Sequence, residues 1–172
     1  LEIASHIAND IFNDSNFPDL NGDLLINCLE SFKMPPGRGE IFSLNKFKII
    51  DDSYNANPES VKAALDHLST FKECRKFFVF GDMKELGDNE EMFHKKIGQY
   101  AVEKTDILFT VGKLAKNAQS NSNNFALSLH FNDNLSLLEK LNELLTDGDI
   151  VLIKGSRSMQ LDQLINELKN VK

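Results

Sequence analysis

Short runs of consecutive apolar residues alternate with segments of helical periodicity along most of this chain, and this alternation constrains the fold most strongly. The runs Phe77–Phe80, Ile107–Val111 and Ile150–Ile153 are almost wholly apolar, as expected for strands that are buried on both faces of a sheet. Between them, apolar residues recur every three or four positions, which is typical of amphipathic helices. The pattern predicts an α/β fold, a mostly parallel sheet with helices on both faces.

The remaining elements follow from the same periodicities and from turn and capping residues. Two strands flanking Asn45-Lys46 predict a hairpin, and Asn57 followed by Pro58 predicts the start of a helix. The further strands expected are Glu40–Leu44, Phe47–Asp51 and Ala126–Phe131. The helices expected are Pro58–Leu68, Glu90–Glu103, Leu114–Ser120, Asn134–Leu145 and Met159–Lys169.

A proline- and glycine-rich stretch predicts a domain boundary near residue 36. Residues 1–36 have the pattern of two short helices, the second around Gly22–Phe32, and Met34–Gly37 (MPPG) then breaks the helix. Residues 37–172 would form the second domain. Because Leu1 falls within a helical pattern, we expect the sequence to begin inside a longer polypeptide.

Composition argues against several classes of function. The net charge is -7 and the pI is near 5.1. These values argue against a general nucleic-acid-binding protein, which needs a basic face. No apolar run approaches the roughly 20 residues that span a bilayer, and no secretory leader opens the chain, which predicts a cytoplasmic protein without membrane contact. Cys28 and Cys74 are isolated and indicate neither a disulfide nor a zinc site.

The loops that follow the predicted strands are the places to look for a ligand site. In an open parallel sheet, ligands bind beyond the carboxyl ends of the strands. Four polar or glycine-containing loops occupy these positions, namely Asp51–Asn57, Gly81–Asp88, Gly112-Lys113 and Lys154–Ser158. We expect them to converge on one site.

Two of these loops have contrasting chemistry. Asp51–Asn57 carries acids, amides and a tyrosine that suit ribose hydroxyls or a base, although a polar turn with an Asn cap would look the same. Lys154–Ser158 carries two cations and two hydroxyls beside a predicted helix start, which suits a phosphate or carboxylate; this interpretation is preferred over a capped helix with solvated cations.

The other signals are weaker. Gly81–Gly87 has alternating charges and is either a substrate loop or a flexible connection. His94 lies four residues after Glu90, which predicts a surface hydrogen bond, and no role is assigned to the four histidines. The sequence has no GxxxxGK[ST], GxSxG, HExxH or GxGxxG motif, so it carries no complete catalytic apparatus of a common kind.

Four motifs, taken together and in order, resemble the Mur ligase family. They are Pro36–Glu40 (PGRGE), Asp51–Pro58 (DDSYNANP), Gly81–Gly87 (GDMKELG) and Lys154–Met159 (KGSRSM). The resemblance implies that residues 37–172 are the Rossmann-like C-terminal domain of such a ligase. Residues 1–36 would be the last helices of its central ATPase domain.

The resemblance also implies a reaction and its participants. ATP, with Mg²⁺, would activate the carboxylate of UDP-N-acetylmuramoyl-tripeptide as an acyl phosphate, and the amine of D-alanyl-D-alanine would attack it. The phosphate loop and the magnesium ligands would lie in the part of the ligase upstream of Leu1. We therefore expect this chain alone to be inactive, and we expect the protein to be a monomer.

Site residues carry over from the family pattern position by position. The nucleotide-binding residues that the resemblance implies are Arg38, Asp52, Tyr54, Asn55 and Asn57. The substrate-binding residues that it implies are Lys84, Ser156, Arg157 and Ser158. Two alternatives stay open: a non-enzymatic Rossmann-like module that binds a nucleotide or a protein, and a sister ligase that adds a single amino acid.

Overall fold

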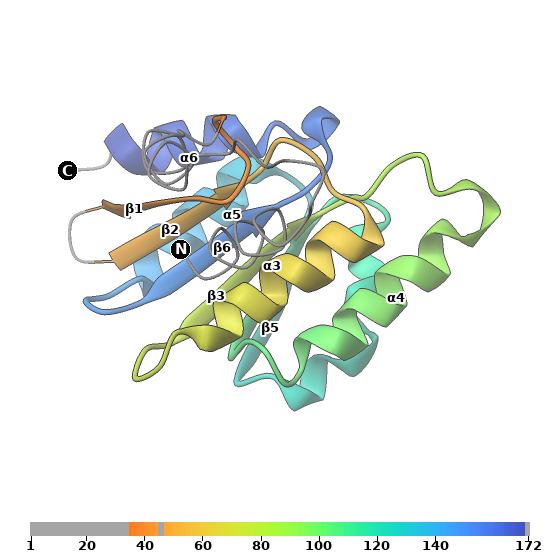
Figure 1. The fold of residues 1–172 in the computed structure, drawn as a ribbon, viewed down its shortest axis with the longest axis horizontal. Coiled ribbons are helices and arrows are strands. Elements are labelled where there is room, and N and C mark those ends of the chain that lie inside the picture. Colours follow the sequence, from red (N-terminus) through yellow and green to blue (C-terminus); the bar gives the residue numbers. More distant parts are fainter. Residues whose placement is uncertain (1–34, 45–46, 171–172) are drawn as a thin grey trace, which may run out of the picture. The chain divides into compact units, whose positions relative to one another are not determined.

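A six-stranded sheet forms the centre of the computed structural model, which describes residues 35–44 and 47–170. The two predicted helices within residues 1–34 and the turn at 45–46 lie outside the described residues. The strands are β1 (Glu40–Leu44), β2 (Phe47–Asp52), β3 (Lys76–Gly81), β4 (Ile107–Val111), β5 (Leu127–Phe131) and β6 (Ile150–Lys154). Their order is β1-β2-β6-β3-β4-β5, with β1 antiparallel to β2 and every other pair parallel (Figure 1). The predicted α/β fold with a mostly parallel sheet is confirmed.

Helices cover both faces of this sheet, as predicted. The α-helices are α3 (Pro58–Thr70), α4 (Glu90–Ala101), α5 (Asn134–Leu144) and α6 (Leu161–Asn170), and the 3-10 segments are η1 (Gly87–Asn89), η2 (Ala115–Asn124) and η3 (Arg157–Met159). Asn57 caps α3, because its side chain accepts a hydrogen bond from the Ser60 backbone N–H at 2.8 Å. Asp133 caps α5 in the same way.

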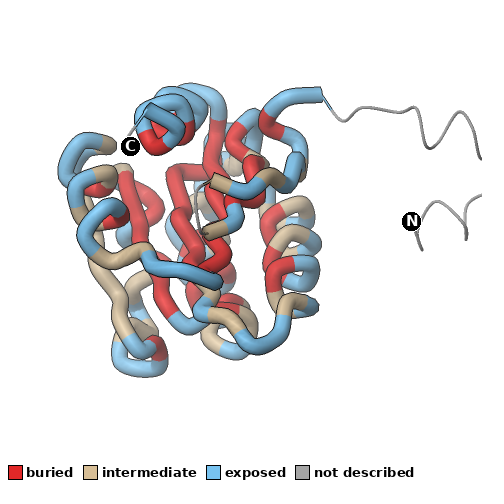
Figure 2. The backbone as a smooth tube through the Cα atoms, turned by 90° about the vertical axis from the view of Figure 1, so that its left-hand side faces the viewer, coloured by how far each residue is buried: buried red, intermediate tan, exposed pale blue. Residues whose placement is uncertain are grey.

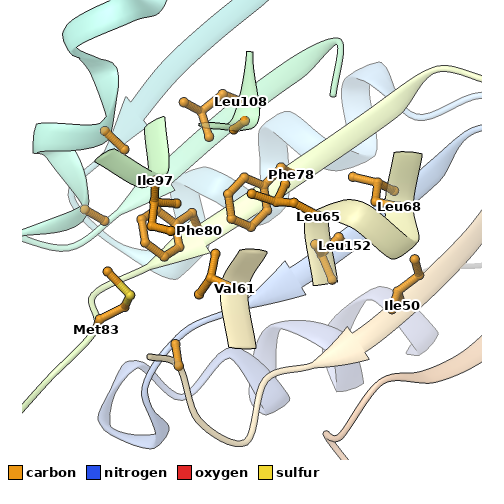
Figure 3. Close-up of a cluster of buried hydrophobic side chains, with 14 of the residues drawn as sticks. Ile50, Val61, Leu65, Leu68, Phe78, Phe80, Met83, Ile97, Leu108 and Leu152 are labelled. Carbon is orange, nitrogen blue, oxygen red and sulfur yellow. The ribbon is translucent and has the colours of Figure 1, made fainter. Parts of the chain in front are cut away.

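Alternate residues along each strand supply two separate cores, as the two-residue period of a strand requires. Phe78 and Phe80 of β3 lie in the core beneath α3 and α4, whereas Phe77 and Val79 lie in the core beneath α5 and α6. Figure 2 shows the buried residues gathered in the interior of this unit, with exposed residues around them. Figure 3 shows the first core, with the apolar side chains of α3 against those of the central strands.

Two predicted helices differ in detail. Leu114–Ser120 was predicted as a helix, but the segment is a 3-10 helix at Ala115–Asn124 that is interrupted at Asn121; its asparagines and serines favour hydrogen bonds to nearby backbone over a regular helix. The last helix begins at Leu161, two residues later than predicted, because Gln160 adopts a left-handed conformation (φ 52°) that ends η3.

Helix α4 packs very closely against η2 at one glycine. A Cβ atom added to Gly98 would lie 2.0 Å from the carbonyl oxygen of Ala118 and 2.7 Å from its Cα atom. These distances are far below van der Waals contact, so only glycine fits at this crossing.

The residues before β1 are joined to the end of β2 by main-chain hydrogen bonds. The N–H of Gly39 donates to the carbonyl of Asp51 at 2.7 Å, and the N–H of Tyr54 donates to the carbonyl of Gly37 at 2.9 Å. Arg38 is therefore attached to the sheet on both sides. Within the described part of the chain, no helix is both long and apolar enough to cross a membrane.

Candidate functional site

The sheet order brings three of the motif loops side by side. Because β6 lies between β2 and β3 and runs parallel to both, the loops that follow these strands leave the sheet at the same edge. Hydrogen bonds join them directly: the N–H of Ser156 donates to the carbonyl of Asp82 at 2.9 Å, and the N–H of Lys84 donates to Oγ of Ser156 at 2.9 Å. The three loops therefore form one surface.

A cleft of about 460 Å³, here called the loop cleft, lies on this surface. It is lined by Tyr54, Asn55, Ala56, Asn57, Lys84, Glu85, Leu86, Ser156, Arg157 and Ser158. Seven of the nine predicted site residues are in this set, and they come from all three loops. The structure thus brings together residues that are up to about a hundred positions apart in the sequence.

Asp52 and Arg38 are the two predicted residues that do not line the loop cleft. The Asp52 carboxylate is held from below by Lys154, whose ammonium group donates to Oδ2 of Asp52 at 2.5 Å and to the carbonyl of Asn55 at 2.9 Å. The side chain of Asp52 keeps a fifth of its surface exposed (20%). Among the described residues, none donates a hydrogen bond to its other oxygen, Oδ1, which remains for a ligand.

Lys154 was predicted to be one of two cations that meet an anion, and this is wrong. Only 1% of the residue is exposed, and its charge is offset by Asp52. Burial lowers the pKa of Lys154, and the hydrogen bond that its ammonium group donates to Asp52 opposes this effect. Arg157 is therefore the cation that the KGSRSM loop presents to solvent.

Several predicted ligand groups also have structural roles. The side chain of Asn57 caps α3, and Oδ1 of Asn55 accepts from the N–H of Ala56 at 2.9 Å. The ammonium group of Lys84 lies 2.9 Å from the buried carboxylate of Asp82. Lys84 consequently reaches the loop cleft as half of an ion pair, which makes it a weaker anion-binding group than a free lysine.

Asp82 organises the loop between β3 and η1. Its Oδ1 atom accepts hydrogen bonds from the backbone N–H groups of Leu114 and Ala115 at 2.9 and 2.8 Å, while Oδ2 contacts Lys84. The loop at Gly112-Lys113 therefore leads into the residues that hold Asp82 in place, but neither Gly112 nor Lys113 lines the loop cleft.

Tyr54 stands between two arginines at the mouth of the loop cleft. The guanidinium carbon of Arg38 lies 4.2 Å from the centroid of the Tyr54 ring, and that of Arg157 lies 5.2 Å from it. Arg38 thus contacts Tyr54, which lines the loop cleft, although Arg38 does not line the cleft itself.

A second cleft of about 440 Å³, here called the helix cleft, lies beside the first along α6. It is lined by Pro36, Gly37, Glu40, Asp51, Ser53, Tyr54, Arg157, Asp162, Ile165, Asn166 and Lys169. Tyr54 and Arg157 line both clefts and so form the wall between them.

His94 was predicted to make a surface hydrogen bond, and this is wrong. The residue is fully buried (0% exposed). Its Nε2 accepts from the N–H of Met83 at 2.8 Å, and its Nδ1 lies 2.6 Å from the carbonyl of Glu90. This arrangement requires a neutral ring with its proton on Nδ1, so His94 fastens the Asp82–Leu86 loop to α4.

We expect His94 to make the unit less stable in mild acid. Burial lowers the pKa of His94, and Asp82 and Glu90 only partly oppose this. A base whose pKa is lowered by folding contributes stability above its unfolded pKa of about 6.5, and this stability is lost as pH falls through the folded pKa. Urea unfolding between pH 7.5 and 5 should therefore show a steeper loss for the natural chain than for His94→Gln.

The exposed His67 supplies the control for this measurement. His67→Gln removes an exposed histidine and shows the effect of losing an imidazole that is not part of this loop. His130, whose pKa is also lowered by burial, is present in all three proteins and cancels in the comparison. Equal pH profiles for the natural chain and His94→Gln would contradict the assignment.

Among the described residues, no group of three or more His, Cys, Asp or Glu side chains is arranged to hold a metal ion. The cleft residues supply amides, hydroxyls, a tyrosine and an arginine. Such groups bind sugar hydroxyls, phosphates and carboxylates, so this surface can position an oxyanionic ligand.

Comparison with known proteins assigns this α/β unit to a family of ligases. The family model described as "Mur ligase, glutamate ligase domain" matches residues 37–157, and the chain belongs to the Mur ligase family. The resemblance inferred from the four motifs is thereby confirmed.

Two relatives within this family carry the same name. The chain is 39% identical over 126 residues to the UDP-N-acetylmuramoyl-tripeptide--D-alanyl-D-alanine ligase of Bacillus subtilis, a match that covers 70% of this chain and 27% of that protein. It is 37% identical over 145 residues to the ligase of the same name from Buchnera aphidicola subsp. Baizongia pistaciae, covering 81% of this chain and 30% of that protein. The chain thus spans less than a third of the length of either relative.

Solved structures agree with the sequence comparison. A crystal structure of MurF from Acinetobacter baumannii superimposes with a TM-score of 0.77 at 26% identity, covering 88% of this chain and 34% of that one. The MurF ligase of Thermotoga maritima in complex with ADP gives 0.72 at 25% identity, covering 87% and 38%. The fold of this chain is that of the corresponding part of these ligases.

Proposed function

We propose that this chain is the C-terminal part of an ATP-dependent ligase that joins D-alanyl-D-alanine to UDP-N-acetylmuramoyl-tripeptide in peptidoglycan precursor synthesis. The observation that supports this best is the loop cleft, in which three motif loops from separate strands meet. In the proposal, residues 37–172 are the C-terminal ligase domain and residues 1–36 the end of the central domain. The full-length protein acts in the cytoplasm as a monomer and contacts neither nucleic acid nor membrane.

The nucleotide side of the site comprises Arg38, Asp52, Tyr54, Asn55 and Asn57. Asp52 offers a carboxylate oxygen to a ribose hydroxyl, and Lys154 fixes the other oxygen so that the group is pre-oriented. The guanidinium of Arg38 supplies positive charge for the nucleotide. The ADP complex of the Thermotoga relative supports a nucleotide as the ligand of this family.

The acceptor side comprises Lys84, Ser156, Arg157 and Ser158. Lys84 is paired with Asp82, so Arg157 is the cation that would take the dipeptide carboxylate, for which its planar donor fork is well suited. Ser156 already accepts from the backbone of Lys84, so its hydroxyl hydrogen remains for a ligand. These residues hold the amine of the dipeptide in place for attack on an acyl phosphate.

Chemistry of this type depends on positioning and charge neutralisation more than on a protein nucleophile. Magnesium would neutralise phosphate charge, and the proposal places its ligands and the phosphate loop in the upstream part of the full-length ligase. The residues of this chain bind and orient the nucleotide and the dipeptide. Alone they should not turn over substrate.

The decisive measurement is ATP-dependent phosphate release by the full-length protein. UDP-N-acetylmuramoyl-tripeptide is supplied with D-alanyl-D-alanine, D-glutamate, L-alanine or L-lysine as acceptor, and release is expected only with the dipeptide. The 172-residue chain alone should release no phosphate. In the full-length protein, Asp52→Ala should weaken ATP binding and Arg157→Ala should weaken dipeptide binding.

The other outcomes point to the alternatives. Release with a single amino acid would identify a sister ligase of the same family. No release with any acceptor would favour a non-enzymatic nucleotide- or protein-binding module, and turnover by the isolated chain would contradict the division of labour proposed here.

A further inference from the structure

Tyr54 is an exposed aromatic residue with an unusual environment. It keeps 40% of its surface exposed, and its ring contacts the guanidinium groups of both Arg38 and Arg157, at 4.2 and 5.2 Å from the ring centroid. An exposed tyrosine can be solvated by water alone, so contacts with two arginines are unusual. Each of them is a cation–π interaction, in which the negative face of the ring attracts the positive charge.

The two arginines are exposed, and the carboxylates that line the helix cleft with Arg157, those of Glu40, Asp51 and Asp162, form no ion pair with either of them. Among the described residues, no ion pair with a carboxylate is formed by either guanidinium. Two positive groups placed near one another repel, and the ring they share offsets part of this repulsion. The result is two donor forks that contact the same ring and can each bind an oxyanion.

The base of the ring is fixed by its neighbours in the chain. The N–H of Tyr54 donates to Gly37, and the preceding Ser53 donates to the buried Asp51 through both its N–H, at 3.1 Å, and its hydroxyl, at 2.6 Å. The carbonyl of Asn55 accepts from the buried Lys154. Residues on both sides of Tyr54 are therefore anchored, which lets the ring act as a rigid platform.

The platform stands between the two clefts. Tyr54 and Arg157 are the two residues common to the linings of the loop cleft and the helix cleft. An anion that binds in either cleft therefore meets the same guanidinium group. Arg38 lies on the same ring, so its charge acts at the same place.

We propose that Tyr54 is a positioning residue whose ring holds Arg38 and Arg157 together as one oxyanion-binding element between the two clefts. The proposal rests on the proposed function for the source of the oxyanion, which is either the phosphate chain of a nucleotide or the carboxylate of the dipeptide. Tyr54 itself need not touch the anion. Its ring face is required, and its hydroxyl is not.

The chain offers a direct probe of this arrangement, because its sequence contains only three arginines, Arg38, Arg75 and Arg157. Arg75 is paired with Asp149 at 2.7 Å and serves as an internal reference. In a ¹⁵N-labelled sample, the side-chain Nε–H signals of Arg38 and Arg157 should show ring-current shifts from Tyr54. In Tyr54→Leu, the chemical shifts of both signals should move to the values of arginines without a neighbouring ring, and the Arg75 signal should not change. Tyr54→Phe should have the same spectrum as the natural chain.

A titration then tests the anion-binding role. Tripolyphosphate represents the phosphate chain, and D-alanyl-D-alanine represents the carboxylate. The ligand that uses the element should shift the Arg38 and Arg157 signals with one common midpoint. Loss of the two ring contacts should weaken that binding about 5- to 10-fold in Tyr54→Leu, and Tyr54→Phe should bind as the natural chain does.

The two parts of the experiment separate this proposal from the proposed function. The comparison of the free proteins involves no ligand, so unmoved Arg38 and Arg157 signals in Tyr54→Leu would overturn the positioning role whatever the enzyme does. Equal affinities in Tyr54→Leu and the natural chain, or the absence of any shift at the two arginines with both ligands, would overturn the oxyanion-binding role. A response to tripolyphosphate but not to the dipeptide, or the reverse, identifies the source of the anion.

Discussion

Replacing Lys154 by methionine is expected to lower the free energy of unfolding by about 2–4 kcal/mol. The substitution keeps most of the side-chain volume but removes the ammonium group that neutralises Asp52 and binds the carbonyl of Asn55. Breaking a fully buried ion pair costs about 3–5 kcal/mol. The expected loss is smaller here because the Asp52 side chain is 20% exposed and water can reach it. Urea unfolding followed by circular dichroism measures the change.

Two variants control for this result. Lys62→Met removes a lysine whose ion pair with Glu59 is exposed, and it should change stability by less than about 1 kcal/mol. Combining Lys154→Met with Asp52→Leu removes both charges and should recover much of the loss, because an apolar pair carries no unpaired buried charge. A double variant as unstable as Lys154→Met would show that packing, not charge, is the cause.

Replacing Gly98 by alanine is expected to destabilise the unit by about 1–2 kcal/mol. Helix propensity alone predicts the opposite sign, since alanine is favoured over glycine by about 1 kcal/mol inside a helix. At this position, however, the added Cβ would lie 2.0 Å from the carbonyl oxygen of Ala118. Either α4 or η2 must move, and overpacking of this kind costs about 1–3 kcal/mol and sometimes more. Thermal and urea unfolding report the net sign.

The neighbouring residue provides the matched control. Gln99 lies on the exposed side of the same helix, and Gln99→Ala should leave stability nearly unchanged because the two residues have similar helix propensities. A stabilised Gly98→Ala protein would mean that α4 and η2 are not packed as closely as described here.

The sequence predicted the layers of this fold well, because continuous apolar strands can be satisfied only inside an α/β sandwich. The order of the strands was not predictable in the same way. Placing β6 between β2 and β3 depends on long-range pairing, such as that of Asp52 with Lys154, which no local periodicity encodes. The irregular η2 segment was missed because a few apolar residues at helical spacing outweighed its unfavourable polar composition.

The site was predicted in outline for a related reason. Loops after parallel strands converge wherever the strands are adjacent, so the motif loops could be grouped before their geometry was known. The buried supports Lys154, Asp82 and His94 were missed because polar side chains next to loops resemble exposed ones in a sequence. A cation directly after a buried strand, with an acid at the end of another strand, is the signal that could have identified the Lys154–Asp52 pair.

The main-chain bonds of Gly37 and Gly39 have a consequence for domain movement in the proposed ligase. They make Arg38 part of the six-stranded unit, so a pivot for this unit would have to lie before Gly37. Whenever the unit swings away from the rest of the enzyme, Arg38 and Arg157 would leave together.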